Sequence, residues 1–160
     1  MKLNFKYSER EFIRGMNQSN GDSKRLLVDF IITLALLGFG IYLYVNGSNG
    51  LLVAFLIVIS IVSMFIMFAR LIIVPRVIFR KEPKYKEEYE LEFLEEEIRF
   101  TAGALKSSIP WSFYKKIKET KEFIYLVYSK RGFAIIPKRV FDTPEGMKNF
   151  LSLISSKIKN

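Results

Sequence analysis

Two long apolar runs, separated by five residues, decide what this chain can fold into. LLVDFIITLALLGFGIYLYV covers residues 26–45, and LLVAFLIVISIVSMFIMFA covers residues 51–69. A helix rises about 1.5 Å per residue, so roughly 20 residues cross the ~30 Å hydrocarbon core of a bilayer. The uncharged connector, residues 46–50, is long enough only for a tight turn. We therefore predict a two-helix transmembrane hairpin that returns both flanks of the chain to one side of the membrane.

The charges predict which side that is. Residues 1–25 carry six Lys or Arg and three acids, residues 70–160 carry nineteen and twelve, and the connector is neutral. Because Lys and Arg collect on the cytoplasmic side, we expect a multi-pass protein of the cell membrane with both termini in the cytoplasm. The 25 mostly polar residues before the first run favour a retained anchor over a signal peptide.

The composition excludes several kinds of chemistry. The chain has neither cysteine nor histidine, which excludes disulfides, the usual zinc sites and every Cys/His or Ser/His nucleophile. Seven glutamates lie between Glu87 and Glu97, and paired carboxylates can do acid–base chemistry. We interpret them as a solvated surface; metal capture by Glu95, Glu96 and Glu97 is disfavoured, because successive strand side chains point to opposite faces. We predict a protein that is not an enzyme and has no catalytic residue, metal or cofactor.

Residues 1–25 form the first predicted domain. Apolar and polar residues alternate at its start, as in a strand with one buried face; the apolar ones are Leu3, Phe5 and Tyr7. Ser8 and Glu11 have the spacing of a capping box, and Phe12 can pack on Tyr7 as a hydrophobic staple. We predict a short helix over about residues 9–18, ended by residues 19–22. The lone strand is expected to join the sheet of the C-terminal domain.

Residues 26–74 form the hairpin, with helices at about residues 26–45 and 51–74. Small residues on both helices allow close contact between them; they are Gly38, Gly40, Ala54, Ser60 and Ser63. Pro75 is expected to end or kink the second helix.

Asp29 is the only acid or base inside the two runs. Near the headgroups an ionised carboxylate costs less than at mid-bilayer. We expect Asp29 to be solvated there or paired with Lys24, Arg25 or Arg70.

Residues 75–160 form the third predicted domain. From Tyr85 the apolar residues recur at every second position, which predicts short antiparallel strands. These strands cover residues 85–93, 97–102, 105–109, 115–120, 123–128 and 133–137. The strand 123–128 is apolar on both faces and should be central. A C-terminal amphipathic helix follows, with Thr143 as N-cap and Pro144 in the first turn.

Several short antiparallel strands followed by one amphipathic helix match the order of a pleckstrin-homology-like (PH-like) β-barrel or sandwich. The start KLNFKYSEREFI, the membrane hairpin and the run SSIPWSFYKKIKETKEFIYLVYSKRGFAIIPKRVF resemble the YcxB-like family of small bacterial membrane proteins over nearly the whole chain. The most specific motifs are Ile109-Pro110-Trp111, Ile117-Lys118-Glu119-Thr120, and Ile136-Pro137-Lys138-Arg139 with Phe141. The resemblance implies an α+β membrane protein with a cytoplasmic PH-like domain, and it carries over no catalytic residues.

The candidate contact residues are basic. They are Arg76, Arg80, Lys81, Lys115, Lys116, Lys118, Lys130, Arg131, Lys138 and Arg139. The first three adjoin the bilayer, where each basic residue gains about 1 kcal/mol from anionic headgroups. The others lie on predicted strands and turns, and either an ordinary solvated surface or a lipid or partner contact accounts for them. Trp111 and Phe113 are expected in the core, with the membrane interface as the alternative position for Trp111.

The leading hypothesis is a non-enzymatic, membrane-anchored cytoplasmic binding or scaffold module with a PH-like domain. Its expected partners are the bilayer itself, anionic lipid headgroups, an unidentified membrane or cytoplasmic protein, and a second copy in a homo-oligomer. Nucleic acid is disfavoured, because the basic residues are mixed with acids and no recognition motif is present. The alternative is an immunity protein that protects its own cell against membrane-active peptides.

Overall fold

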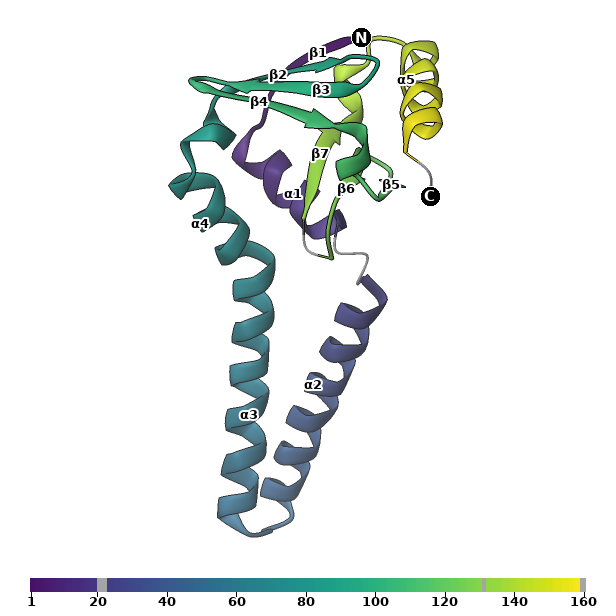
Figure 1. Ribbon diagram of the computed structural model, residues 1–160. Helices are drawn as coiled ribbons and strands as arrows, with labels where there is room; N and C mark the ends of the chain where they lie inside the picture. The colour runs from purple at the N-terminus through teal and green to yellow at the C-terminus, as the bar shows by residue number, and fades with distance from the viewer. Residues whose placement is uncertain (20–22, 131, 159–160) are drawn as a thin grey trace. The chain divides into compact units, whose positions relative to one another are not determined.

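The computed structural model describes residues 1–19, 23–130 and 132–158. Its contacts divide the chain into two compact units. Met1–Ser19 and Ile78–Asn160 form the first, which we name the sheet unit, and Asn20–Val77 form the second, which we name the hairpin unit. Figure 1 labels the helices and strands of both units.

The sheet unit is built from short antiparallel strands and flanking helices. Its strands are β1 (Lys2–Lys6), β2 (Glu88–Phe93), β3 (Glu97–Ala102), β4 (Leu105–Pro110), β5 (Lys116–Glu119), β6 (Phe123–Val127) and β7 (Phe133–Pro137). Its helices are α1 (Glu9–Ser19) and α5 (Pro144–Lys157), with 3-10 turns at Pro83–Lys86, Trp111–Phe113 and Lys138–Val140. The chain is α+β, as predicted. Tyr85 lies in the first of these turns, so the prediction that a strand begins there is wrong; Pro83 starts a helical turn instead.

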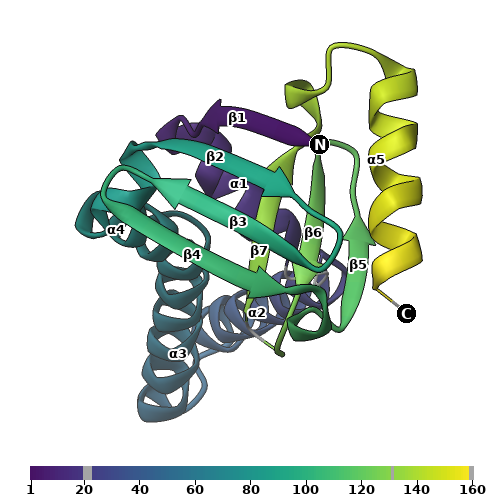
Figure 2. The same cartoon turned by 45° about the horizontal axis from the view of Figure 1, so that its top comes forward.

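The strands form two separate sheets with the orders β1-β2-β3-β4 and β5-β6-β7. Figures 1 and 2 show that their strands run in clearly different directions. The central position predicted for residues 123–128 is confirmed, since β6 pairs with both β5 and β7. The sheets do not close into a barrel. Pro110, which has no N–H to donate, ends β4 and leads into a 3-10 turn, and β5 starts a new sheet.

β1 is an edge strand of the four-stranded sheet. It pairs antiparallel with β2, from Lys2 opposite Glu92 to Lys6 opposite Glu88. The prediction that the N-terminal strand joins the C-terminal sheet is therefore confirmed. The alternation along β1 sets which face is buried. Because β1 precedes the hairpin and β2 follows it, the two flanks of the hairpin are hydrogen-bonded to each other.

The predicted cap of α1 forms in part. The amide of Glu11 donates to Ser8 Oγ at 3.2 Å, and the rings of Tyr7 and Phe12 lie 5.9 Å apart as the expected staple. The Glu11 carboxylate does not serve the cap but accepts two hydrogen bonds from Arg139. α1 ends at Ser19, and the rest of the predicted stop at residues 19–22 lies outside the described residues.

α5 closes the core as its apolar stripe predicts. The side chain of Thr143 accepts from the amide of Gly146 at 3.0 Å, so the predicted N-cap is confirmed. Phe150 and Ile154 are fully buried. The Phe150 ring packs between Phe93 of β2 and Phe141, with centroids 4.9 and 5.1 Å away.

Trp111 and Phe113 have different surroundings. Trp111 is buried and its Nε1 donates to the carbonyl of Leu94 at 3.1 Å, as expected of a core residue. Phe113 is 47% exposed, which contradicts the prediction. The 3-10 turn directs Phe113 outward, where its ring stacks on Tyr128 at 4.8 Å.

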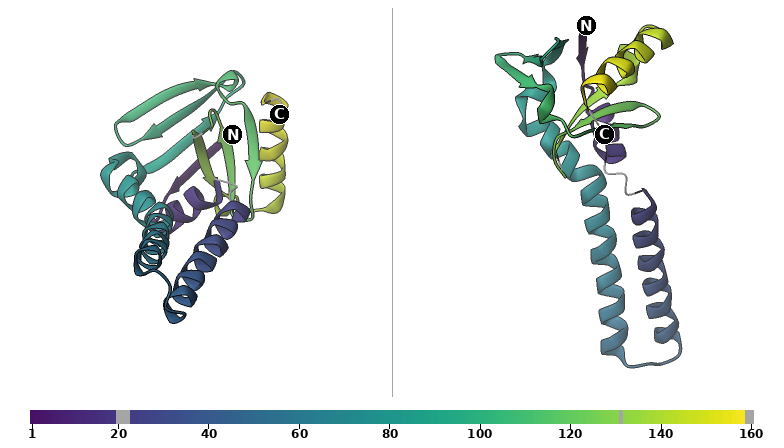
Figure 3. Two further views of the ribbon diagram at one scale, coloured as in Figure 1. Left: turned by 90° about the horizontal axis from the view of Figure 1, so that it is seen from below. Right: turned by 45° about the vertical axis from the view of Figure 1, so that its right-hand side comes forward.

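The hairpin unit contains α2 (Ser23–Val45), α3 (Gly50–Phe68) and a π-helical turn at Ala69–Ile73, and α4 (Val74–Lys81) follows. Figure 3 shows α2 and α3 side by side. At the end of α2 the amides of Gly47 and Ser48 donate to the carbonyls of Tyr44 and Leu43, with Gly47 at φ +69°. This is a Schellman motif. Asn49 then caps α3 by accepting from the amide of Leu51 at 2.9 Å. The predicted antiparallel pair is confirmed.

Some of the small residues face the partner helix. A Cβ at Gly40 would lie 3.3 Å from side-chain atoms of Leu56 and Ile57, whereas one at Gly38 would meet nothing. Ser60 is fully buried, and its hydroxyl donates to the carbonyl of Leu56 at 2.8 Å. Gly40 and Ser60 therefore let the helices approach, and Gly38 does not contribute.

Most of the apolar surface of the hairpin stays exposed. The apolar spans Leu26–Val45 and Gly50–Lys81 have mean hydropathies of 2.3 and 3.0, and only 11% of each tested window is buried. Both helices are long and apolar enough to cross a membrane. Their exposure distinguishes them from core helices of a water-soluble globule.

The helix passes through Pro75 rather than ending there. Helical structure continues to Lys81. Proline cannot donate a backbone hydrogen bond and its ring crowds the preceding turn. Immediately upstream, the amide of Val74 bonds to the carbonyl of Ala69, five residues back, and this wider π turn accommodates the proline.

Candidate functional site

The sheet unit contains a cavity of about 420 Å³ that is open to solvent, and β4, which lines it, is mostly exposed. Its walls come from Tyr7, from α1, from the inward faces of β2, β3 and β4, and from β7 and the residues around β6. Alternation along the strands builds the inner wall, because every second side chain points the same way. On three adjacent strands these side chains are Tyr89 and Leu91, Ile98 and Phe100, and Leu105, Ser107 and Ile109. The cavity is within the range of about 300–1,000 Å³ typical of small-molecule sites.

Two small residues leave the space open. Ser107 lies opposite Phe100 in the β3–β4 register, where its neighbours along the inward face are Leu105 and Ile109. Ala134 lines the cavity from β7, between Phe133 and Ile135. Large residues at these two positions would fill the cavity.

Five tyrosines line this cavity. Tyr7, whose hydroxyl donates to the carbonyl of Ile135, already has a partner in the protein. The other four tyrosines that line it, Tyr85, Tyr89, Tyr114 and Tyr128, make no side-chain hydrogen bond to the described part of the chain. Within that part, no fully enclosed polar side-chain atom lacks a partner. The four hydroxyls therefore keep contact with open space.

Burial raises the pKa values of three of these tyrosines, Tyr85, Tyr89 and Tyr114. Burial, with a smaller contribution from the neighbouring Tyr128, raises the pKa of Tyr114 to about 12. Burial also raises the pKa of Tyr89, with a contribution from Tyr85. Burial also raises the pKa of Tyr85. Tyr128 raises this pKa as well, whereas Lys84 lowers it. We name these four lining side chains the polar cluster; within it the rings of Tyr114 and Tyr128 lie 6.3 Å apart.

The shifted pKa of Tyr114 predicts a loss of stability at high pH. An unfolded tyrosine ionises near pH 10, whereas Tyr114 stays neutral in the fold up to about pH 12. The folded state thus binds more protons above pH 10, so this contribution is complete below pH 10 and is lost as the pH rises toward 12. We expect Tyr114→Phe to reduce the alkaline loss in unfolding free energy by about 2 kcal/mol. Urea unfolding from neutral pH to pH ~12 measures it; an unchanged slope would contradict the prediction.

The rim of the cavity is apolar with one cation. Leu105 and Phe113 are both 47% exposed there. Lys84 Nζ lies 5.1 Å from the centroid of the Tyr85 ring and 3.6 Å from the Glu82 carboxylate. Lys84 is the one charged residue among those that line the cavity in the described chain. The site can therefore hold an apolar body and one polar or anionic end.

Several predicted basic residues serve the fold. Arg139 donates to both carboxylate oxygens of buried Glu11 at 2.6 and 2.7 Å and to the carbonyl of Lys6 at 2.8 Å. Lys118 Nζ donates to the carbonyl of Ser19 at 2.6 Å, at the end of α1. Lys138 pairs with Glu119. These three side chains fasten α1 and β5 within the sheet unit.

The remaining predicted contact residues lie mostly on the surface. Arg80 pairs with Glu9 at 3.3 Å. The others with described positions are exposed, and they are Arg76 and Lys81 in α4, Lys115 before β5, Lys116 in β5 and Lys130 after β6. Arg131 lies outside the described residues. Their role as lipid or partner contacts stays a prediction.

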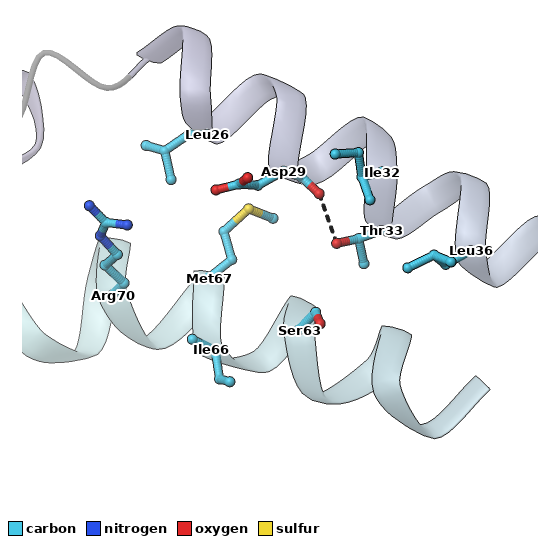
Figure 4. Close-up of a pocket in the computed structure, with 9 residues that line it drawn as sticks. All are labelled: Leu26, Asp29, Ile32, Thr33, Leu36, Ser63, Ile66, Met67 and Arg70. Atoms are coloured by element: carbon cyan, nitrogen blue, oxygen red, sulfur yellow. Dashed lines mark hydrogen bonds between the residues drawn. The ribbon is translucent and has the colours of Figure 1, made fainter. Parts of the chain in front are cut away.

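Between α2 and α3, within the hairpin unit, lies a second cavity of about 310 Å³ (Figure 4). Asp29 and Arg70 both line one end of it, and Thr33 Oγ1 donates to the carbonyl of Asp29 at 2.8 Å. Ser63 lines it from α3. Lys24 and Arg25 are the other two predicted partners of Asp29, and their side chains lie outside the described part of the structure. Asp29 thus shares a pocket with one of its three expected partners.

The cavity of the sheet unit was not found from sequence. Its tyrosines and phenylalanines occupy the inward positions of strands, where the same alternation also predicts an ordinary filled core. Ser107 gave no signal, since a serine on an exposed edge strand is ordinary. In the described residues, no group of three or more His, Cys, Asp or Glu side chains is placed to hold a metal ion.

Comparison with known proteins gives one family. Residues 93–154 match the model of the family described as YcxB-like protein. The match runs from the last residue of β2 into α5, and it does not include β1, α1 or the hairpin. The predicted resemblance is therefore confirmed for the C-terminal strands. No curated protein and no solved structure matches the chain.

Proposed function

We propose that this chain is a non-enzymatic binding module that α2 and α3 anchor in a membrane, with the sheet unit on the cytoplasmic side. The observation that carries the proposal is the pairing of β1 with β2. A chain that leaves one strand, crosses a bilayer twice and returns to the neighbouring strand must keep both flanks on one side. The match of residues 93–154 to a YcxB-like family supports the same assignment.

The exposed apolar surface supports membrane insertion. Large apolar side chains such as Leu51, Phe55 and Phe65 are 60–81% exposed, and continuous surface of this kind is rare on water-soluble monomers. In lipid the same side chains contact apolar acyl chains, and the backbone N–H and C=O groups are hydrogen-bonded within each helix. The excess of Lys and Arg in both flanks favours the cytoplasmic side for them.

The sheet unit supports a binding role. Four strands, then three, then one C-terminal helix follow the order expected of a PH-like domain. The cavity offers a binding site in its interior. Lys81, Lys115, Lys116 and Lys130 are exposed, so they are among the basic residues of the sheet unit that are available to anionic headgroups.

The topology is tested with single cysteines, which the natural sequence lacks. Ser48→Cys lies in the connector, whereas Asn4→Cys and Ser155→Cys lie on exposed positions of β1 and α5. In intact cells we expect a membrane-impermeant maleimide to label Ser48→Cys alone. After permeabilisation all three should react, which controls for accessibility.

Labelling of the Asn4 or Ser155 variant from outside would overturn the cytoplasmic assignment. Release of the protein from membranes by alkaline carbonate would overturn the anchor itself. The two results are independent, so orientation and insertion are tested separately.

A further inference from the structure

The cavity between the two sheets has the form of an amphiphile site. Its inner wall is apolar and includes Phe12, Leu91, Ile98 and Phe100. Its polar groups include Tyr85, Tyr89, Tyr114 and Tyr128, all of which line it, and the rings of Tyr114 and Tyr128 lie 6.3 Å apart. A nucleotide or a sugar would need many polar partners spread around it. An apolar body with one polar end needs the arrangement that is present.

The polar cluster favours an anionic end. Four tyrosine hydroxyls can donate hydrogen bonds, and Lys84 lies over the Tyr85 ring at the rim. The partner that Lys84 has, Glu82, is 3.6 Å away and its side chain is 53% exposed. Such a surface ion pair is worth little, so a carboxylate or phosphate group can replace it. A cationic end would instead meet the Lys84 ammonium.

We infer that this cavity binds a single acyl chain with an anionic headgroup, either a fatty acid or a lysophospholipid. The chain lies along the apolar wall, and the headgroup accepts hydrogen bonds from the tyrosine cluster and Lys84. The inference rests on the proposed function, because a bilayer beside the sheet unit supplies the ligand. It does not follow from that function, since a membrane-anchored module could equally bind a protein.

The test uses the full chain in phosphatidylcholine nanodiscs and a palmitic acid probe with a diazirine at the end of its chain. After irradiation, the adducts are located by mass spectrometry of peptides. We expect adducts on α2 and α3, which bulk lipid surrounds, and also on inward residues of β3 and β4 such as Phe100 and Ser107. The hairpin adducts serve as an internal standard for the amount of probe.

Two neighbouring variants separate the cavity from the surface. Ser107→Phe places a ring in the cavity, and Ser108→Phe places the same ring on the opposite face of β4, opposite Arg99. Each ligand methylene that is excluded from the cavity lowers the affinity about fourfold. If Ser107→Phe excludes two or three methylenes, the sheet-unit adducts should fall by about tenfold or more. The second variant should label like the natural chain.

The headgroup and its source are tested by competition. Unlabelled fatty acids should compete about fourfold better for each added methylene until the cavity is full. The acid should outcompete the alcohol of equal length by about tenfold. Lys84→Met should abolish that preference, whereas Lys86→Met, outside the cavity, should keep it. Comparing palmitate with palmitoyl lysophosphatidylglycerol shows which of the two the site prefers.

The possible failures are distinguishable. Adducts on the hairpin with none in the sheet unit, or sheet-unit adducts equally present in Ser107→Phe, would overturn the inference and leave the anchor intact. Absence of adducts from the hairpin would instead count against the proposed function. Equal competition by acid and alcohol would overturn the anionic headgroup.

Discussion

Deletion of residues 1–19 is expected to unfold the sheet unit, although most of that unit lies beyond residue 77. The deletion removes the β1 ladder and the buried side chains Leu3, Phe5, Tyr7 and Phe12. Each such side chain contributes about 1.5–3 kcal/mol when buried, and together they approach the 5–15 kcal/mol of a typical domain. The deletion also removes Glu11 and the helix that covers β6 and β7 through Gly15.

Hydrogen exchange in nanodiscs measures this result. The amides of β2 and β3 should exchange like those of unstructured peptides in the deleted chain, and a synthetic peptide of residues 1–19 should restore their protection. The control replaces the outward side chains of β1 with serine, at Lys2, Asn4 and Lys6, and should leave exchange unchanged because the ladder and the buried face remain. Full protection of β2 in the deleted chain would show that β1 is dispensable.

Arg139→Met is expected to cost about 3 kcal/mol, the lower end for breaking a buried pair, because Arg139 itself is half exposed. The carboxylate of Glu11 is only 8% exposed and would lose both hydrogen bonds from the guanidinium. The carbonyl of Lys6 would lose its bond as well. The raised pKa of Arg139, caused first by its hydrogen bonds to Glu11, agrees with a favourable pair.

The double variant Glu11→Met with Arg139→Met sharpens the test. Removing both charges leaves no buried carboxylate unpaired, so most of the loss should be recovered. Lys2→Met, which breaks the exposed pair with Glu90, should cost less than about 1 kcal/mol. Urea unfolding followed by Trp111, the one tryptophan of the chain and a buried residue of the sheet unit, gives the free energies. If Arg139→Met lost no more unfolding free energy than Lys2→Met, a structural role for Arg139 would be contradicted.

The parts predicted correctly from sequence are those that local pattern determines. The apolar runs and their connector predict the hairpin, and alternation at Leu3 and Phe5 predicts a strand whose only available partners lie after the hairpin. The N-cap at Thr143 follows from the residue types that satisfy free amides. Each of these features depends on residues that are near one another in the chain.

The parts that escaped prediction depend on distant residues. The Glu11 carboxylate could bond the Ser8 amide or Arg139, and only the fold brings Arg139 within 2.6 Å. Pro75 predicts an interrupted helix, but the π turn that accommodates the proline is determined by backbone geometry. The cavity arises where two sheets fail to fill the space between them, which inward aromatic residues alone do not reveal.

The placement of the hairpin between two neighbouring strands constrains how the protein is made. About 80 residues separate β1 from β2, and at 5–20 residues per second the ribosome needs roughly 4–16 seconds to synthesise them. During that interval β1 lacks its neighbour in the sheet, and it gains that neighbour only when β2 has been synthesised. On the proposed topology, the edge of β2 therefore stays open in any chain whose N-terminal strand is not on the same side of the membrane as β2.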